Sequence, residues 1–183
     1  MEHTVIQVIA TMMVFLTLSF KPVSSEVDIT RTGCGKTKFC LAVPDDCDPA
    51  GSGSCLFGSV KPTAINIPNG VDMAFELSGN SEGYIAIGLI PNNSELLNFF
   101  SCGKNSGSFF FRSSIANQTS TTEEEEPMET TVTGNSTNGV NIKCTFTVAK
   151  VNASKISSAR TTENITYSVI IGSGNVENGK SRT

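Results

Sequence analysis

The residues best suited to covalent or metal chemistry in this chain are six cysteines and a single histidine. The histidine is His3, close to the N-terminus. Ser-His-Asp and Cys-His catalysis, and ligation of zinc or haem by histidine, all need an imidazole in the folded domain. If the first segment is cleaved, the mature chain has none, so we exclude these chemistries and expect no catalytic residue and no bound metal.

The spacing of the cysteines favours disulfides over a metal site. The four N-terminal cysteines are separated by five, six and seven residues, whereas zinc-binding pairs have about two to four intervening residues. In an oxidising compartment an even number of cysteines predicts three disulfides. Two cysteines lie outside the cysteine-dense segment, so we expect Cys102 to pair with Cys144 and the other four to pair among themselves. The six are Cys34, Cys40, Cys47, Cys55, Cys102 and Cys144.

The N-terminal segment predicts secretion. Residues 5–20 are mostly apolar but too short and too polar to span a bilayer comfortably. Small residues Val23 and Ser25 fit a cleavage site after Ser25. We therefore predict a signal peptide over residues 1–25 and a single extracellular domain over residues 26–183, without a transmembrane segment. An uncleaved signal anchor is the alternative.

Five Asn-X-Ser/Thr sequons agree with an extracellular location and predict exposed, glycosylated positions. They are Asn92, Asn117, Asn135, Asn152 and Asn164.

Composition narrows the class of protein. The 183 residues carry a formal net charge of −4, which argues against a nucleic-acid partner. Charged residues make up only 16% of the chain, and 16 glycines accompany many Ser, Thr and Asn residues. This composition is typical of a turn-rich β protein. The acidic run at residues 123–126 is interpreted as a solvated loop.

The elements that must position these residues are short strands. Apolar side chains alternate with polar ones over residues 71–77, 140–148 and 165–171, which predicts half-buried strands. Residues 84–90 form a continuous apolar run, which suits a strand buried on both faces. We expect residues 71–77 and 84–90 to form a hairpin, residues 99–102 and 109–111 to flank another turn, and residues 40–43 and 55–60 to be strands. We expect residues 26–37 to be a polar lead-in, 150–161 to hold a helical turn, and 172–183 to be a loose tail. The predicted fold is an all-β, antiparallel, immunoglobulin-like sandwich stabilised by disulfides.

Several motifs resemble the DOMON domain of ferric-chelate reductase 1-like proteins, over about residues 32–179. These are residues 33–40 with Cys47, Asp48-Pro49 and Cys55, residues 75–79, residues 82–88, Cys102, residues 142–146, and the closing strand before Gly172. The resemblance implies a β-sandwich that binds haem or sugar outside a membrane-embedded cytochrome b561 module. It also implies that haem-binding members hold iron with a Met after the strand at residues 84–88 and a His near the end of the domain.

This chain departs from that pattern at both ligand positions. Residues 89–101 contain no Met, and no His follows Ile171. Asn92 adds a sequon to the loop where the first ligand would lie. We therefore expect no haem b and transfer no reductase chemistry.

The first hypothesis is a secreted, non-catalytic binding module with a protein or glycan partner. Its expected recognition surface is made of two loops, residues 90–101 and 113–127, and includes the apolar residues Leu96, Leu97, Phe99 and Phe100. The alternatives are a sugar-binding domain, part of a longer membrane reductase, and a haem domain with substitute ligands. The candidate substitutes are Met73, Met128, Tyr84 and Tyr167. Core packing is the competing interpretation for Met73, both tyrosines and both phenylalanines.

Overall fold

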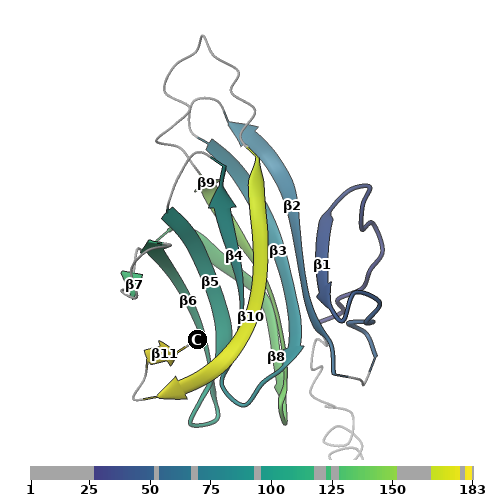
Figure 1. Cartoon of the computed structure of the whole chain (residues 1–183), viewed down its shortest axis with the longest axis vertical. Helices are drawn as coiled ribbons and strands as arrows, with labels where there is room; N and C mark the ends of the chain where they lie inside the picture. Colours follow the sequence, from purple (N-terminus) through teal and green to yellow (C-terminus); the bar gives the residue numbers. More distant parts are fainter. Residues whose placement is uncertain are drawn as a thin grey trace, which may run out of the picture.

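The chain folds as two antiparallel sheets stacked face to face, which confirms the predicted disulfide-stabilised β-sandwich (Figure 1). A computed structural model describes residues 27–51, 54–66, 70–92, 96–117, 123–124, 128–151, 166–177 and 180–182. The first sheet has the order β1-β2-β3-β9-β8 and the second the order β11-β10-β4-β5-β6-β7. The strands are β1 (Phe39–Val43), β2 (Leu56–Asn66), β3 (Gly70–Asn80), β4 (Tyr84–Pro91), β5 (Leu96–Asn105), β6 (Ser108–Asn117), β7 (Glu123–Glu124), β8 (Thr130–Asn138), β9 (Asn141–Val151), β10 (Tyr167–Glu177) and β11 (Lys180–Arg182).

The main core lies between the two sheets. Alternation along β3 and β9 sends one set of side chains inward, including Phe75 and Phe146, whose stacked rings have centroids 4.8 Å apart. From the second sheet, Phe100 and the partly buried Phe111 contact Phe146 at centroid distances of 5.7 and 4.8 Å. Strand β4 is buried on both faces for most of its length, as its apolar run predicts. The alternating pattern of the sequence therefore locates the inner face of each sheet.

A disulfide links the sheets through this core. Cys102 of β5 and Cys144 of β9 are both fully buried and are paired, with Cα atoms 6.6 Å apart. This pairing agrees with the one expected from the sequence. An inter-sheet disulfide is also a feature of immunoglobulin sandwiches.

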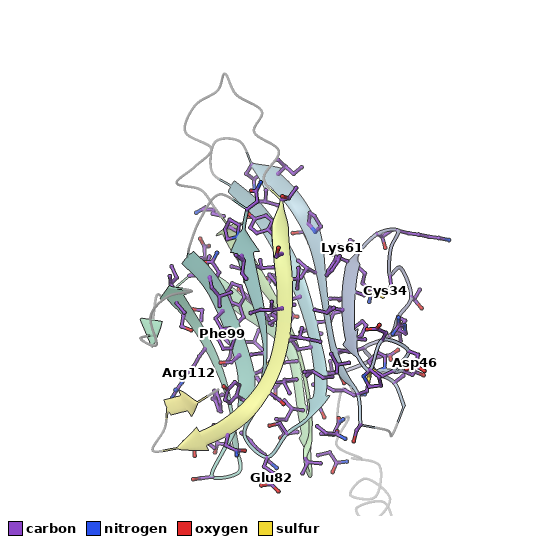
Figure 2. All side chains as sticks on the ribbon, in the orientation of Figure 1. Cys34, Asp46, Lys61, Glu82, Phe99 and Arg112 are labelled. Atoms are coloured by element: carbon purple, nitrogen blue, oxygen red, sulfur yellow. A yellow bond between two sulfur atoms is a disulfide. The ribbon has the colours of Figure 1, made fainter. Side chains whose placement is uncertain are left out.

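A second, smaller core lies on the outer face of the first sheet. Phe57 of β2 points outward and is covered by Ile29, Val27 and the disulfide Cys47–Cys55, in the region where Figure 2 labels Cys34 and Asp46. The prediction that residues 26–37 form a polar lead-in is therefore wrong in part, because Ile29 is fully buried. The exposed Asp28 between the buried Val27 and Ile29 gives the local alternation that the sequence interpretation overlooked.

The hairpin predicted for β3 and β4 is wrong. Strand β3 pairs with β2 and β9, whereas β4 pairs with β10 and β5. The turn at residues 81–83 instead carries the chain from one sheet to the other. Both strands have strongly apolar inner faces, and placing them in opposite sheets lets those faces pack against each other.

Three further segments differ from what the sequence predicts. Strand β8, which was not predicted, is an edge strand whose Thr, Asn and Ser side chains give no apolar alternation. The predicted loose tail is partly ordered, because β10 continues to Glu177 and pairs with β11. The acidic run contributes Glu123 and Glu124 to the short strand β7.

Some expectations fall outside the described residues. These are the signal peptide at residues 1–25 and most of the helical turn predicted over residues 150–161, of which Lys150 and Val151 belong to β9. Within the described part of the chain, no helix has the length and apolar character needed to cross a membrane.

Candidate functional site

A cavity opens where the edges of the two sheets separate. At one end of the cavity the two sheets touch at Gly58 of β2. An added Cβ atom at Gly58 would lie only 2.8 Å from Cγ2 of Ile171 on β10. Further along the same two strands the lining side chains are Val60 and Pro62 on β2, and Val169 and Tyr167 on β10. The strands therefore meet at one point and leave a space beyond it, which we call the edge cavity.

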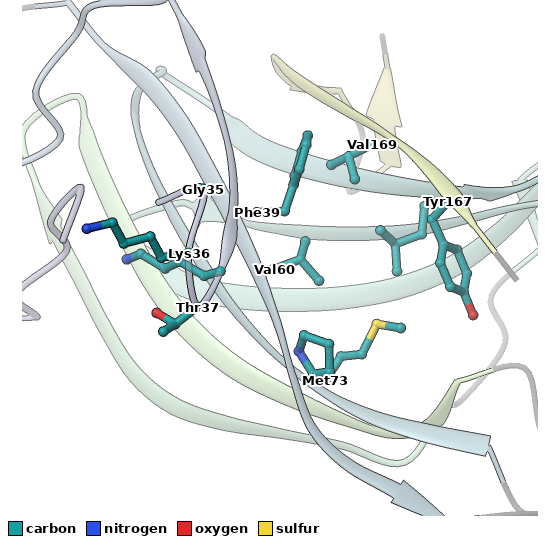
Figure 3. A pocket seen from close by; sticks show the side chains of 11 residues that line it. Gly35, Lys36, Thr37, Phe39, Val60, Met73, Tyr167 and Val169 are labelled. Atoms are coloured by element: carbon teal, nitrogen blue, oxygen red, sulfur yellow. The ribbon is translucent and has the colours of Figure 1, made fainter. Parts of the chain in front are cut away.

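The edge cavity has a volume of about 460 Å³ and a mostly apolar lining. Such a volume lies in the range of small-molecule sites. Met73 of β3 and Leu89 of β4 belong to the main core and also line the cavity, and Figure 3 labels Met73 and Tyr167 among the lining side chains. The complete lining is Gly35, Lys36, Thr37, Lys38, Phe39, Val60, Pro62, Met73, Leu89, Tyr167 and Val169.

One wall of the cavity is the loop closed by the Cys34–Cys40 disulfide. The carbonyl oxygen of Gly33 accepts hydrogen bonds from the backbone N–H groups of Lys36, Thr37 and Lys38, at 3.1, 2.9 and 3.1 Å. Gly33 has a φ of 89°, a left-handed conformation that glycine adopts without strain. The loop is therefore compact, and it ends at Phe39, whose side chain is 53% exposed beside the cavity.

Strand β2 extends past its partner at this point. Phe39, the first residue of β1, pairs with Val60, so among the residues that the structure describes no strand pairs with the β1 side of β2 from Lys61 to Asn66. Pro62 lies in this stretch, and a bulge follows it. Proline lacks an N–H group and is tolerated where a strand edge is open. The early end of the β1 pairing is thus encoded locally and leaves room for the cavity.

An ion pair anchors the loop to the outer face of the first sheet. Nζ of Lys38 donates to Oε2 of Glu76 on β3 at 2.6 Å and to the carbonyl oxygen of Thr30 at 2.8 Å. Oγ of Ser59 on β2 donates to the same carboxylate at 2.7 Å. The Lys38 side chain is only 9% exposed, so its charge is largely removed from water and depends on these partners.

The edge cavity has little fixed charge directed into it. The Lys38 ammonium is engaged by Glu76, and the Lys36 side chain points away from Met73 and Tyr167 in Figure 3. An apolar cavity with a small number of polar groups fits a compact apolar ligand better than a strongly anionic one.

The cavity does not reproduce the haem-ligating pair that the family resemblance implies. Its soft or aromatic donors are the Met73 thioether and the Tyr167 phenol, and its lining contains no imidazole. Of the other substitute ligands considered, Tyr84 is buried in β4, and Met128 packs against the main core. The lining of the edge cavity therefore does not supply a Met–His pair for haem.

The structure places the remaining predicted site residues as follows. All six cysteines are paired, the N-terminal four as Cys34–Cys40 and Cys47–Cys55. Asn92 lies in an exposed turn after β4, and Asn135 is exposed on edge strand β8. The backbone of Asn117 ends β6. Asn152 and Asn164 lie outside the described residues.

The two recognition loops predicted from the sequence are largely strands. Residues 96–101 belong to β5 and residues 113–117 to β6. Phe100 is fully buried in the core, whereas Leu97 and Phe99 are partly buried. The prediction of a loop surface there is wrong, because these residues form a strand that pairs with β6. In that strand Leu97, Phe99 and Ser101 alternate with inward-facing side chains.

Sequence reasoning did not find the edge cavity. Its lining comes from one disulfide loop, from the consecutive strands β2, β3 and β4, and from β10, which is distant from them in sequence. The one available local signal was Pro62 within an otherwise strand-like segment, which marks an open edge.

Fold and site together define a disulfide-stabilised β-sandwich with an apolar cavity between its sheet edges. Two curated proteins share a segment with it, both named "Putative ferric-chelate reductase 1". The protein from Danio rerio is 39% identical over 56 residues, and the one from Xenopus laevis is 37% identical over 57 residues. Each match spans 31% of this chain and 9% of the relative. Over that segment the chain is similar to ferric-chelate reductase-like proteins. No protein-family model matches the chain, and no solved structure matches it significantly.

Proposed function

We propose that this chain is a secreted, non-catalytic binding module, related to the ferric-chelate reductases, whose edge cavity holds a compact apolar ligand. The observation that carries the proposal is the cavity itself, about 460 Å³ in volume and lined mainly by apolar side chains from both sheets. Small-molecule sites are lined predominantly by apolar side chains and are usually largely formed before the ligand binds.

The residues offer support for a binding role rather than a redox role. Residues 89–101, where the family resemblance implies a Met ligand, contain no Met. Two of the three disulfides stiffen the N-terminal region beside the cavity. A rigid site of this kind lowers the entropy lost on binding.

Sugar binding has weaker support at this site. Phe39 and Tyr167 offer aromatic surface, but the lining is mainly apolar, and of its charged side chains Lys38 is already engaged by Glu76. A protein or glycan partner elsewhere on the surface is compatible with this proposal, since it would use other residues.

A haem domain is the second candidate, because Met73 and Tyr167 line one cavity. Methionine and tyrosine both occur as haem ligands in proteins. The two proposals predict different spectra, so a single measurement separates them.

The test uses the full chain expressed through a secretory pathway. We expect a folded, colourless protein that shows no stoichiometric Soret band after incubation with haem and desalting. The same sample should bind N-phenylnaphthylamine, a neutral apolar probe, at one site with enhanced fluorescence. A reversible Soret band that is lost in Met73→Leu or Tyr167→Phe would overturn the proposal in favour of haem. A folded protein that binds neither probe nor haem would also contradict it.

A further inference from the structure

The Cys34–Cys40 disulfide closes the loop that forms one wall of the edge cavity. All five residues between Cys34 and Cys40, from Gly35 to Phe39, line the cavity. We propose that reduction of the Cys34–Cys40 disulfide opens this wall and releases the ligand. The inference rests on the function proposed above and adds a means of regulating the same site.

The disulfide is a major constraint on the conformation of the loop. The hydrogen bonds accepted by Gly33 are local, within five residues along the chain. Beyond them, the loop is joined to the sheet by the Lys38–Glu76 ion pair and by the pairing of β1 that begins at Phe39. Closing a loop covalently removes many of its alternative conformations, and breaking the bond restores them.

The three disulfides differ in their exposure to a reductant. Cys102 and Cys144 are each 0% exposed, and Cys47 and Cys55 are 9% and 8% exposed. Cys34 and Cys40 are only partly buried. The rate of thiol–disulfide exchange depends on access to a sulfur atom. A dithiol should therefore reach the Cys34–Cys40 pair first.

The reaction needs an external dithiol, either a protein oxidoreductase or a small molecule. One of its thiolates attacks Sγ of Cys34 or Cys40, the S–S bond breaks, and a mixed disulfide forms. The second thiolate of the reductant then attacks this mixed disulfide. The reductant leaves as a disulfide, having given two electrons, and both cysteine sulfurs leave as thiolates that take up protons from water.

The expected consequence is faster ligand release. The loop at residues 35–39 would then be held only by its local hydrogen bonds, the Lys38–Glu76 ion pair and the pairing of β1, so the exposed side chain of Phe39 would be less constrained beside the cavity. An apolar ligand would then contact more water, which weakens its binding. The strands that supply the opposite wall carry no part of this disulfide.

The experiment measures release of N-phenylnaphthylamine from the full secreted chain by stopped-flow fluorescence while dithiothreitol is titrated. Alkylation followed by peptide mass spectrometry reports which cysteines have been reduced. We expect Cys34 and Cys40 to be alkylated first and the dissociation rate to rise by about tenfold, the equivalent of about 1.4 kcal/mol. The double variant Cys34→Ser/Cys40→Ser should release the probe at the fast rate without reductant.

The matched control is Cys47→Ser/Cys55→Ser, which removes the other disulfide of the N-terminal region. Neither of these cysteines lines the cavity. It should keep slow release and remain sensitive to dithiothreitol. Hydrogen exchange of the partly reduced wild-type chain gives a second readout that needs no variant, and exchange should increase within residues 34–40.

The outcomes separate the two proposals. If the oxidised chain does not bind the probe, the proposed function fails. If it binds but the Cys34→Ser/Cys40→Ser variant, folded by circular dichroism, releases the probe at the oxidised rate, the redox control is refuted and the binding function stands. Reduction of another disulfide before Cys34–Cys40, or unchanged hydrogen exchange after its reduction, refutes the redox control as well.

Discussion

Gly58 of β2 and Ile171 of β10 form the contact that closes one edge of the sandwich. An added Cβ atom at Gly58 would lie 2.8 Å from Cγ2 of Ile171 and 3.1 Å from Cδ1 of Ile87. Real Cβ atoms do not approach other atoms as closely as the first of these distances. The absence of a side chain at Gly58 is therefore what allows the two sheets to approach each other just below the edge cavity.

The first prediction concerns this contact. Gly58→Val should destabilise the fold by about 1–3 kcal/mol, because the new side chain overpacks the junction and pushes the sheets apart. Urea denaturation followed by circular dichroism measures the change. Gly172→Val is the control, since an added Cβ atom there meets nothing within 4 Å. Equal stability of the two variants would show that the junction can relax without cost.

The second prediction concerns the aromatic centre of the core. Phe146→Ala should cost about 3–5 kcal/mol, because Phe146 is 1% exposed and contacts three other phenylalanine rings. Phe39→Ala, at a site that is 53% exposed, provides a comparison and should change stability by less than about 1 kcal/mol. An unchanged denaturation midpoint for Phe146→Ala would contradict the assignment of this residue to the core.

Most of the fold could be predicted because apolar residues recur at every second position along the strands and mark the inner face of each sheet. Strand β9 alternates polar residues with Ile142, Cys144, Phe146 and Val148, and each of these four is buried. Strand β8 could not be predicted in this way. It is an edge strand, and the partly buried Val132 is its one large apolar side chain. The crossover between β3 and β4 was also missed. A short turn between two apolar strands has the same sequence pattern whether the strands pair in one sheet or pack against each other from opposite sheets.

The candidate site was harder to predict than the fold. Pairing of the cysteines could be argued from their positions, but nothing local indicated that the Cys34–Cys40 loop faces β10 across a cavity. That arrangement depends on where β1 stops pairing with β2 and on the Gly58–Ile171 contact. The first depends on the register of two consecutive strands, and the second joins segments far apart in sequence. A cavity of this kind becomes visible only when the register of several strands is known.

The third prediction tests the ion pair that anchors the loop. Glu76→Gln should lower stability by about 1–3 kcal/mol, because the Lys38 ammonium, at 9% side-chain exposure, loses its countercharge. Thermal denaturation at two salt concentrations provides the measurement. Glu129→Gln is the matched control, since its ion pair with Lys150 has side chains that are 72% and 58% exposed, and exposed pairs contribute little. Similar losses for both variants would show that the Lys38 pair is no more important than a surface pair.

The fourth prediction concerns glycosylation at Asn92 and Asn135. Both side chains are exposed, which makes them accessible to a glycosyltransferase. Asn135 lies on the edge strand β8, and a glycan there would also hinder pairing with another chain. Glycopeptide mass spectrometry of the secreted protein should find both sites occupied, and Asn135→Gln should raise the tendency to associate, measured by size-exclusion chromatography. Site occupancy near zero at both positions would contradict the prediction.

The fifth prediction fills the edge cavity from β10. Val169 lines the cavity, whereas the next residue, Ile170, points to the opposite face of the same strand and is 41% exposed. Val169→Phe should occupy space that the apolar probe needs. If the ligand can no longer bury an apolar surface equal to that of one side chain, its binding free energy weakens by about 1.5–3 kcal/mol. This change corresponds to a decrease in affinity of about tenfold to a hundredfold. Ile170→Phe makes the same kind of change on the outer face and should leave probe affinity within about twofold of wild type, since effects at sites away from the ligand are small. Isothermal titration with N-phenylnaphthylamine, after circular dichroism has shown that both variants are folded, measures the difference. Equal affinities in the two variants would mean that the probe binds outside the edge cavity, and the apolar outer face near Ile170 would then have to be examined as its site.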